Sequence, residues 1–435
     1  MNFRTNCIAC TLAVLCFALP AQAQTSILDA ITKGRPVIDL RGRFETVQDA
    51  GKTLDANAST LRARLGYETG SWNGLSLQAD FDQIWTIGGA TYNSTRNGKT
   101  GYPVVADPAM TALNRLQLTY ASDFNTKFIL GRQRLLIGNQ RFVGNVGWRQ
   151  HEQTFDALSA VNTSLDGLAL SYAYLYRVNR IDGPALPIPA NTTAAAAGQA
   201  TYFKSNSHVM DALYSGVPGL RLEGYAFLLD LSAPGYATLP AQQLATARLS
   251  TATIGGRTEY GFSLDDGIAA KVSAEFAHQS NYAANPLSIG LNYWLGEGSL
   301  TWNGLSGLVG YEVLEGNGTI GFATPLATLH AFNGWADMFL TTPANGLKDF
   351  YLKAGYSLPA DFVAAKNLNL SAIWHDYRTD ALTQGIGSEW DLQAELVMDA
   401  NLSFLAKYAN YASAGVAFGG FPDRSIFWLQ TAYKY

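Results

Sequence analysis

The segment Asp39-Leu40-Arg41-Gly42-Arg43-Phe44-Glu45-Thr46 alternates strictly between two kinds of residue. Successive side chains of a β-strand point to opposite faces of the sheet. One face of this segment therefore carries the charged residues Asp39, Arg41, Arg43 and Glu45. The other face carries Leu40, Gly42, Phe44 and Thr46. The pattern predicts a strand with one polar face and one largely apolar face.

The same alternation recurs along most of the chain. Thr60, Arg62, Arg64 and Glu68 oppose Leu61, Ala63, Leu65 and Tyr67, and Gln78, Asp80 and Asp82 oppose Leu77, Ala79 and Phe81. We predict about 18 strands of roughly ten residues, as is typical of an outer-membrane β-barrel. They are expected near residues 39–46, 60–68, 77–82, 114–121, 126–136, 155–163, 168–178, 208–215, 221–231, 251–263, 268–279, 287–301, 305–315, 347–358, 368–377, 387–398, 402–412 and 425–435.

The connections between these segments alternate in length. Asp166-Gly167, Pro218-Gly219 and Asn303-Gly304 mark short turns, in which glycine supplies the positive φ that tight hairpins need. Longer connections lie between the short turns, at residues 88–113, 137–154, 180–207, 232–250 and 316–346. A soluble β-sandwich shows the same alternation within each strand, but it gives no reason for alternating loop lengths. Short turns on one side and long loops on the other indicate a transmembrane barrel.

Composition agrees with a membrane wall built from strands. Charged residues make up 15% of the chain, against about 25% in ordinary globular proteins. No internal stretch approaches the roughly 18 consecutive apolar residues of a membrane helix. Cys7, Cys10 and Cys16 precede residue 24, so we expect no disulfide, cysteine metal site or cysteine nucleophile after that point. The net charge of −4 gives no reason to expect nucleic-acid binding.

The N-terminus has the features of a secretory signal peptide. Arg4 precedes an apolar core at residues 7–19, and Pro20-Ala21-Gln22-Ala23 is a small-residue cleavage pattern. We expect a signal peptide at residues 1–23, with cleavage near Ala23-Gln24, and a short lead at residues 24–34. A single barrel domain is expected at residues 35–435, in the bacterial outer membrane.

The C-terminal segment has one apolar and aromatic face. Phe427, Leu429, Thr431, Tyr433 and Tyr435 share this face. A last strand that ends in an aromatic residue resembles the signal by which bacterial outer-membrane proteins are recognised for insertion. An apolar edge left unpaired is prone to aggregation. We therefore expect the last strand to close on the first.

One connection differs from the others in composition. Residues 131–156 contain Arg132, Arg134, Arg141 and Arg149 among many Gln and Asn residues. We expect this segment to fold into the pore and to set what passes. Guanidinium groups pair with carboxylates and keep their charge at any working pH. The candidate pore-lining residues are Arg41, Arg43, Arg62, Arg64, Arg115, Arg132, Arg134, Arg141, Arg149, Asp80 and Asp82.

Two interpretations of these arginines are open. In the first, they form a filter whose weak sites, worth about 0–1 kcal/mol each, bind and release an anionic solute. In the second, they form a structural lattice with the acids, which braces the lumen. For Arg141 and Arg149 the composition favours the filter, because Glu152 and Asp156 are the only acids in the segment.

Two stretches resemble the alginate-export family of outer-membrane proteins. The first runs from Leu130-Gly131-Arg132-Gln133 through residues 139–150 to Gln153-Thr154-Phe155-Asp156. The second runs from Thr324-Pro325-Leu326 to Ala336-Asp337-Met338-Phe339 and is followed by residues 346–351. The resemblance covers about residues 35–435. It implies a monomeric barrel of about 18 strands whose lumen is lined by arginines and acids.

The resemblance also implies a function, which is passive passage of an anionic polysaccharide or oligosaccharide such as alginate. Partners would be outer-membrane lipid, the transported saccharide and periplasmic export or uptake proteins. The alternative is an uptake porin for small anionic or aromatic solutes. A third interpretation, a plugged adhesion barrel, predicts no conductance.

Neither the second stretch nor the histidines indicate a catalytic site. His330, Asn333, Trp335 and Asp337 suit stacking against a sugar, but an extracellular loop folded on the barrel mouth is the favoured interpretation. None of the histidines lies in a His-Glu-x-x-His or Gly-x-Ser-x-Gly motif; they are His151, His208, His278, His330 and His375. We therefore expect no enzyme, no cofactor and no metal site.

Overall fold

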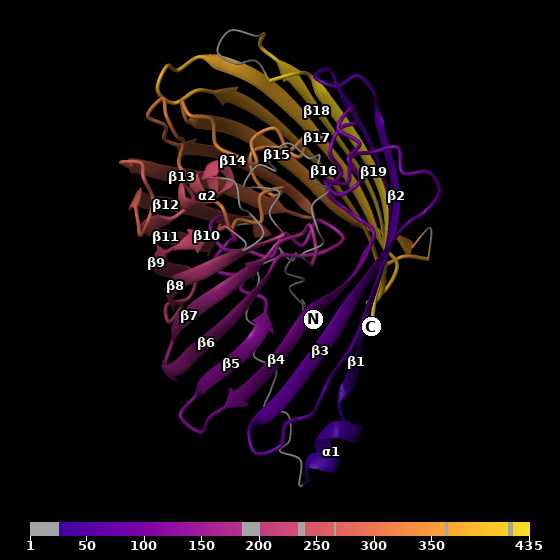
Figure 1. Ribbon diagram of the computed structural model, residues 1–435, viewed down its shortest axis with the longest axis vertical. Coiled ribbons are helices and arrows are strands. Elements are labelled where there is room, and N and C mark those ends of the chain that lie inside the picture. Colours follow the sequence, from indigo (N-terminus) through magenta and orange to yellow (C-terminus); the bar gives the residue numbers. More distant parts are fainter. Residues whose placement is uncertain (1–25, 185–200, 234–239, 265–266, 362–363, 416–420) are drawn as a thin grey trace.

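All strands of the computed structural model belong to one antiparallel sheet that closes on itself. The structure describes residues 26–184, 201–233, 240–264, 267–361, 364–415 and 421–435. The first strand, β1 (Arg35–Asp49), pairs with β2 (Ala56–Glu68) along one edge and with β19 (Arg424–Lys434) along the other. Figure 1 shows the strands following one another around the wall in chain order. The predicted closure of the last strand on the first is confirmed.

The other strands follow in sequence. They are β3 (Leu75–Thr86), β4 (Met110–Ala121), β5 (Thr126–Gln133), β6 (Thr154–Leu165), β7 (Leu168–Asn179), β8 (Tyr202–Tyr214), β9 (Leu220–Leu228), β10 (Leu231–Ser232), β11 (Thr251–Ser263), β12 (Ala269–Asn281), β13 (Gly290–Trp302), β14 (Leu305–Leu314), β15 (Leu347–Pro359), β16 (Asn367–Arg378), β17 (Gly385–Val397) and β18 (Leu402–Ser413). Both β9 and β10 pair with β8, so they are two parts of one wall strand. The barrel therefore has 18 strands, and the predicted fold class is confirmed.

The predicted segments differ from the strands mainly at their ends; β8, for example, begins at Tyr202 rather than near residue 208. The difference that matters for the site lies at β5. A strand was expected over residues 126–136, but β5 ends at Gln133 because the chain leaves the wall there and turns into the lumen. Gly131 has a φ of 115°, a conformation that glycine adopts more readily than other residues. The predicted signal peptide lies outside the described residues, as do parts of the predicted connections at residues 180–207 and 232–250.

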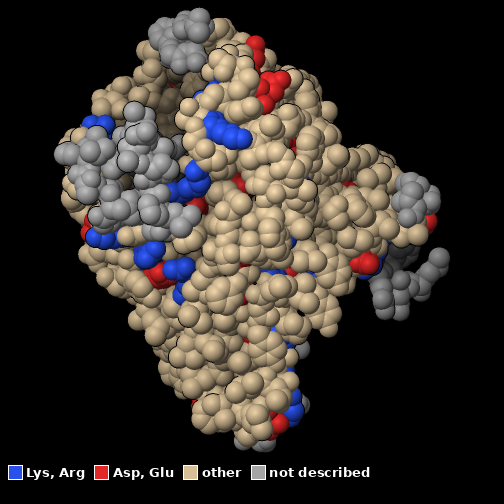
Figure 2. Space-filling view, turned by 45° about the vertical axis from the view of Figure 1, so that its right-hand side comes forward, with Lys and Arg blue, Asp and Glu red and all other residues tan. Residues whose placement is uncertain are grey.

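The two faces of each strand meet different environments. On the outer face, Leu65, Phe81 and Trp390 are each more than half exposed, whereas Arg64 and Asp82 on the inner face are buried. Figure 2 shows a broad uncharged band over the wall, with most of the visible charges toward its edges. An apolar outside around a polar inside is the arrangement of a barrel whose wall faces lipid.

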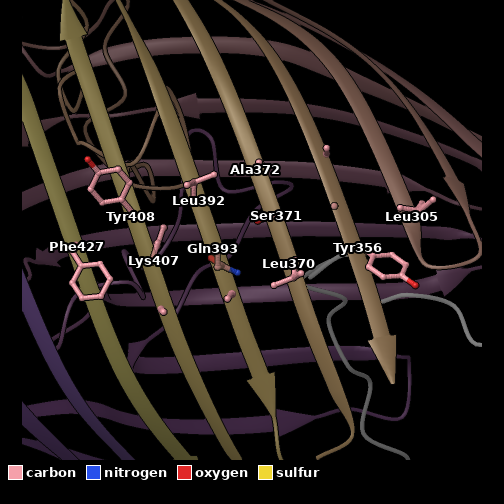
Figure 3. Close-up of a pocket in the computed structure, with 14 residues that line it drawn as sticks. Leu305, Tyr356, Leu370, Ser371, Ala372, Leu392, Gln393, Lys407, Tyr408 and Phe427 are labelled. Carbon is pink, nitrogen blue, oxygen red and sulfur yellow. The ribbon is translucent and has the colours of Figure 1, made fainter. Parts of the chain in front are cut away.

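A shallow groove of about 530 Å³ lies on this outer face, across β14 to β19. Its rim includes Tyr356, Leu370, Leu392 and Tyr408, which Figure 3 shows spread over neighbouring strands rather than gathered around an enclosed space. All four side chains are exposed on the lipid-facing side. The groove is therefore part of the lipid-facing wall, and a solute site has to be sought in the lumen.

Two helices accompany the barrel in the part of the chain that the structure describes. The first, α1 (Ile27–Thr32), precedes β1, and the second, α2 (Pro240–Ala247), lies between β10 and β11. Among the residues that the structure describes, neither helix is long and apolar enough to cross a membrane.

Candidate functional site

The connection from β5 to β6, which we name loop A (residues 134–153), lies inside the barrel. Lumen-facing arginines of β1 bind its backbone. Arg41 Nη1 donates to the carbonyl oxygens of residues 147–149 at 3.0–3.2 Å, and Arg43 Nη2 donates to Trp148 O at 2.7 Å. The Arg43 guanidinium also lies 4.0 Å from the centre of the Trp148 ring. The prediction that the Arg/Gln segment enters the pore is confirmed.

A second inward connection, loop B (residues 315–346), packs against loop A. Val143 and Leu326 form a parallel β-bridge, and Gly144 N donates to Leu326 O at 2.9 Å. Thr328 N donates to Gln140 O at 3.1 Å. Val143 and Leu326 are fully buried, in an apolar cluster that includes wall residues of β9 and β13. The two loops therefore form one packed body within the lumen.

Loop B lies deeper than the sequence indicated. The N–H groups of Trp335 and Ala336 donate to Asp391 and Glu389, two lumen-facing acids of β17. The expectation of a loop folded on the barrel mouth is therefore wrong. The Trp335 ring is also occupied, because Lys407 Nζ lies 3.5 Å from its centre, so the structure does not favour stacking of a sugar there.

His330 connects the two loops to the wall. Its ring stacks on Trp148 with 4.5 Å between ring centres. Nδ1 lies 2.8 Å from Asp337 Oδ1, and Nε2 lies 2.8 Å from Lys407 Nζ. Burial lowers the pKa of His330 to about 3, so the ring is neutral near pH 7. A neutral ring can donate from Nδ1 to Asp337 and accept from Lys407 at Nε2.

Two arginines of loop A, Arg141 and Arg149, are paired with acids that lie far away in the sequence. Arg141 binds Glu312 at 2.7 Å, and Arg149 lies 3.2 Å from Glu45 and 3.1 Å from Asp337. Both arginines are buried. The reasoning that favoured Arg141 and Arg149 as unneutralised filter charges was wrong, because the wall and loop B supply the missing carboxylates.

The wall arginines also form a lattice with acids. Arg64 binds Asp82 at 2.6 Å and Glu152 at 2.7 Å, and His151 Nδ1 lies 2.8 Å from the same Asp82. The other pairs of this lattice are Arg62 with Asp39, Arg115 with Asp80, and Arg134 with Glu152. These contacts favour the structural interpretation for the buried members, Arg62 and Arg64.

Arg132 stands apart from the other candidates. It is in register with Leu116 on one neighbouring strand and with Asp156 on the other, to which it is bound at 2.7 Å. Two residues earlier, Leu130 is exposed on the outer face. Arg132 and Asp156 therefore share the outward face of the wall, and the expectation that Arg132 lines the pore does not fit its place.

Accessible arginines meet in the half of the lumen that carries the short turns. A cavity of about 460 Å³ is lined by Arg35, Pro36, Val37, Glu68, Gln78, Arg115, Arg134 and Tyr435. The Arg134 side chain is 29% exposed and the Arg115 side chain 15%. Arg35, which the sequence candidates omitted, binds Glu68 and is 76% exposed. Arg35 alternates in phase with Asp39, and this pattern could have identified Arg35 as a lumen-facing residue.

The described residues hold no group of three or more His, Asp or Glu side chains placed to bind a metal ion. What they do hold is a set of guanidinium groups around a cavity. Guanidinium groups recognise carboxylates bidentately. Together, fold and lumen define an outer-membrane-type barrel with a partly filled pore.

Comparisons with known proteins agree on the fold. No family model and no curated protein matches the chain. Among solved structures, OccK3 (OpdO) of Pseudomonas aeruginosa is 14% identical, covers 94% of this chain and 97% of its own, and has a TM-score of 0.66. OccAB2 of Acinetobacter baumannii is 12% identical, with coverage of 94% and 99% and a TM-score of 0.69. OpdK of P. aeruginosa, solved with vanillate, is 13% identical, with coverage of 93% and 99% and a TM-score of 0.68.

At these identities the likeness shows the fold alone. The chain has the 18-stranded barrel of the Occ/Opd porins. The expected membership of the alginate-export family is not supported, because no family model matches and the similar structures carry other names.

Proposed function

We propose that this protein is an outer-membrane channel that passes small anionic solutes, aromatic carboxylates among them. The observation that carries the proposal is the lumen cavity, whose lining holds three arginines, Arg35, Arg115 and Arg134, and one acid, Glu68. Arg115 and Arg134 also bind Asp80 and Glu152, but their side chains stay partly exposed. An exposed guanidinium–carboxylate contact is worth about 0–1 kcal/mol, which lets a solute bind and leave.

The inward loops favour a small solute over a polymer. Loops A and B fill part of the lumen with a buried cluster that includes Phe142, Val143 and Leu326. The cavity of about 460 Å³ lies in the size range of small-molecule sites, roughly 300–1,000 Å³. These observations support the uptake alternative better than passage of an alginate-like polysaccharide.

One similar structure adds support for the solute class. OpdK was solved with vanillate, which is a small aromatic carboxylate. A site with several guanidinium groups is chemically suited to such a ligand.

The test compares an acid with its neutral counterpart. Proteoliposomes are assayed for initial uptake of labelled galacturonate and galactose, which differ only at one carbon. We expect galacturonate to enter faster, and we expect the double variant Arg115→Gln, Arg134→Gln to lose that preference. Equal rates for the two sugars in the wild-type protein would overturn the proposal.

A matched control removes a charge outside the lumen. Arg378 lies at the end of β16, binds Asp376 and is more than half exposed. Arg378→Gln is expected to leave the preference for galacturonate unchanged.

A further inference from the structure

The short helix α1 carries an apolar face that no described part of the chain covers. Ile27, Leu28 and Ile31 are 58%, 66% and 51% exposed. At 3.6 residues per turn these three side chains fall within an arc of about 100°. Asp29 and Lys33 lie on the other side of the helix and bind each other at 3.2 Å. The helix is therefore amphipathic, and its apolar side is the open one.

Tyr67 of β2 shows on which side of the wall α1 lies. Tyr67 alternates in phase with Leu65 on the outward, lipid-facing surface. Its hydroxyl donates to Ile31 O at 2.5 Å, and a Cβ added at Gly34 would overlap its ring. The helix is thus attached to the outer side of the barrel rim and does not enter the lumen.

The contacts of α1 also show at which end of the barrel the helix lies. Gly70 N, in the short turn between β2 and β3, donates to Ala30 O at 2.8 Å. Figure 1 shows α1 at the lower tip of the barrel, at the start of β1. Short turns lie on the periplasmic side of outer-membrane barrels. The apolar face of α1 therefore continues the lipid-facing wall at its periplasmic edge, beside Leu65 and Tyr67.

We propose that α1 is an interfacial anchor, which inserts Ile27, Leu28 and Ile31 into the periplasmic leaflet of the bilayer. Amphipathic helices of this kind bury their apolar face about 5–10 Å into the boundary between headgroups and acyl chains. The Asp29–Lys33 pair then faces the periplasm. The anchor holds the beginning of β1, the strand on which the barrel closes against β19. This inference rests on the membrane location in the proposed function.

Site-specific fluorescence tests the anchor. From Gln24 onward the chain contains no cysteine, so a single introduced cysteine can be labelled. Leu28→Cys and the matched variant Lys33→Cys are labelled with a nitrobenzoxadiazole dye and reconstituted into phosphatidylcholine vesicles. We expect a spin label near the lipid headgroup to quench the label at position 28 at least about threefold more strongly than the label at position 33. Iodide in the water is expected to quench them in the opposite order.

A label at a third position distinguishes a failure of the anchor from a failure of the membrane location. Leu65→Cys places the dye on the lipid-facing wall, where lipid quenching is expected for any inserted barrel. If the label at position 65 is not quenched by lipid, the membrane location itself fails. If it is quenched while the labels at positions 28 and 33 respond equally to iodide, the anchor alone is overturned.

Discussion

Replacing Arg134 by Gln removes one positive charge from the cavity and leaves the neighbouring lattice paired. Glu152, the acid bound to Arg134, keeps Arg64 at 2.7 Å and Asn145 at 2.6 Å. The Arg134 side chain is partly exposed, so its own ion pair is worth only about 0–1 kcal/mol. We therefore expect the thermal midpoint of barrel unfolding to shift by less than about 2 °C.

The effect on conduction is expected to be larger than the effect on stability. A unit charge about 6 Å from a passing monovalent ion contributes about 0.7 kcal/mol in a water-filled lumen. The charge attracts chloride and repels potassium by this amount, so the two effects add to about 1.4 kcal/mol, and the chloride/potassium permeability ratio should fall about tenfold. Zero-current potentials of single channels under a KCl gradient measure this ratio directly.

The control for this experiment is Arg378→Gln, which removes the same charge from outside the lumen. An unchanged permeability ratio in Arg134→Gln, or an equal loss in Arg378→Gln, would refute the reasoning. A large drop in the thermal midpoint of Arg134→Gln would show that this arginine belongs to the buried lattice instead.

Two further substitutions and one deletion probe the scaffold. Arg149→Met leaves Glu45, Asp107 and Asp337 buried without their shared cation. We therefore expect the free energy of unfolding to fall by about 3–5 kcal/mol, seen as a lower midpoint of heat modification on gels. A wild-type midpoint would contradict this. Gly334→Ala puts a Cβ, at a φ of 83°, into Tyr377 Oη and Glu389, so loop B should become sensitive to protease. In the control Gly290→Ala the Cβ meets open space, so loop B should stay resistant. Equal resistance of the two variants would argue against the packing of loop B. Deleting Tyr435 removes the donor to Ile38 O at the closing seam and should reduce assembly, so a full yield of heat-modifiable barrel speaks against its role.

The lumen arginines fall into two groups, which differ in how far their side chains are buried. Arg64, Arg141 and Arg149 are buried against carboxylates, and removing one partner of such a pair leaves an uncompensated charge. Arg35, Arg115 and Arg134 keep part of their surface open to the cavity. Only the second group can meet a solute without breaking the scaffold.

The wall could be predicted from the sequence because its signals are local. Alternation of two residues assigns each side chain to the inside or the outside, as Arg64 and Leu65 show. Gly and Asn at the short turns fix the hairpins, and Asn303 and Gly304 both adopt a positive φ. These signals need no knowledge of distant residues.

The site could not be predicted in the same way, because its contacts join distant parts of the chain. Arg141 meets Glu312 and Arg149 meets Asp337 across a lumen that no periodicity describes. Arg132 was misplaced because it was judged by the composition of its segment, although it alternates in phase with Leu130 on the outer face. The resemblance to the alginate-export family rested on two loop stretches, and these turned out to pack against each other.

The central claim is that a lumen narrowed by loops A and B passes small anions past accessible arginines. Single-channel recordings with galacturonate chains of increasing length test it most directly. We predict that the monomer and dimer cross and interrupt the ionic current briefly, while a long chain leaves the current unchanged. Block by the long chain alone, with no response to the monomer, would contradict the account.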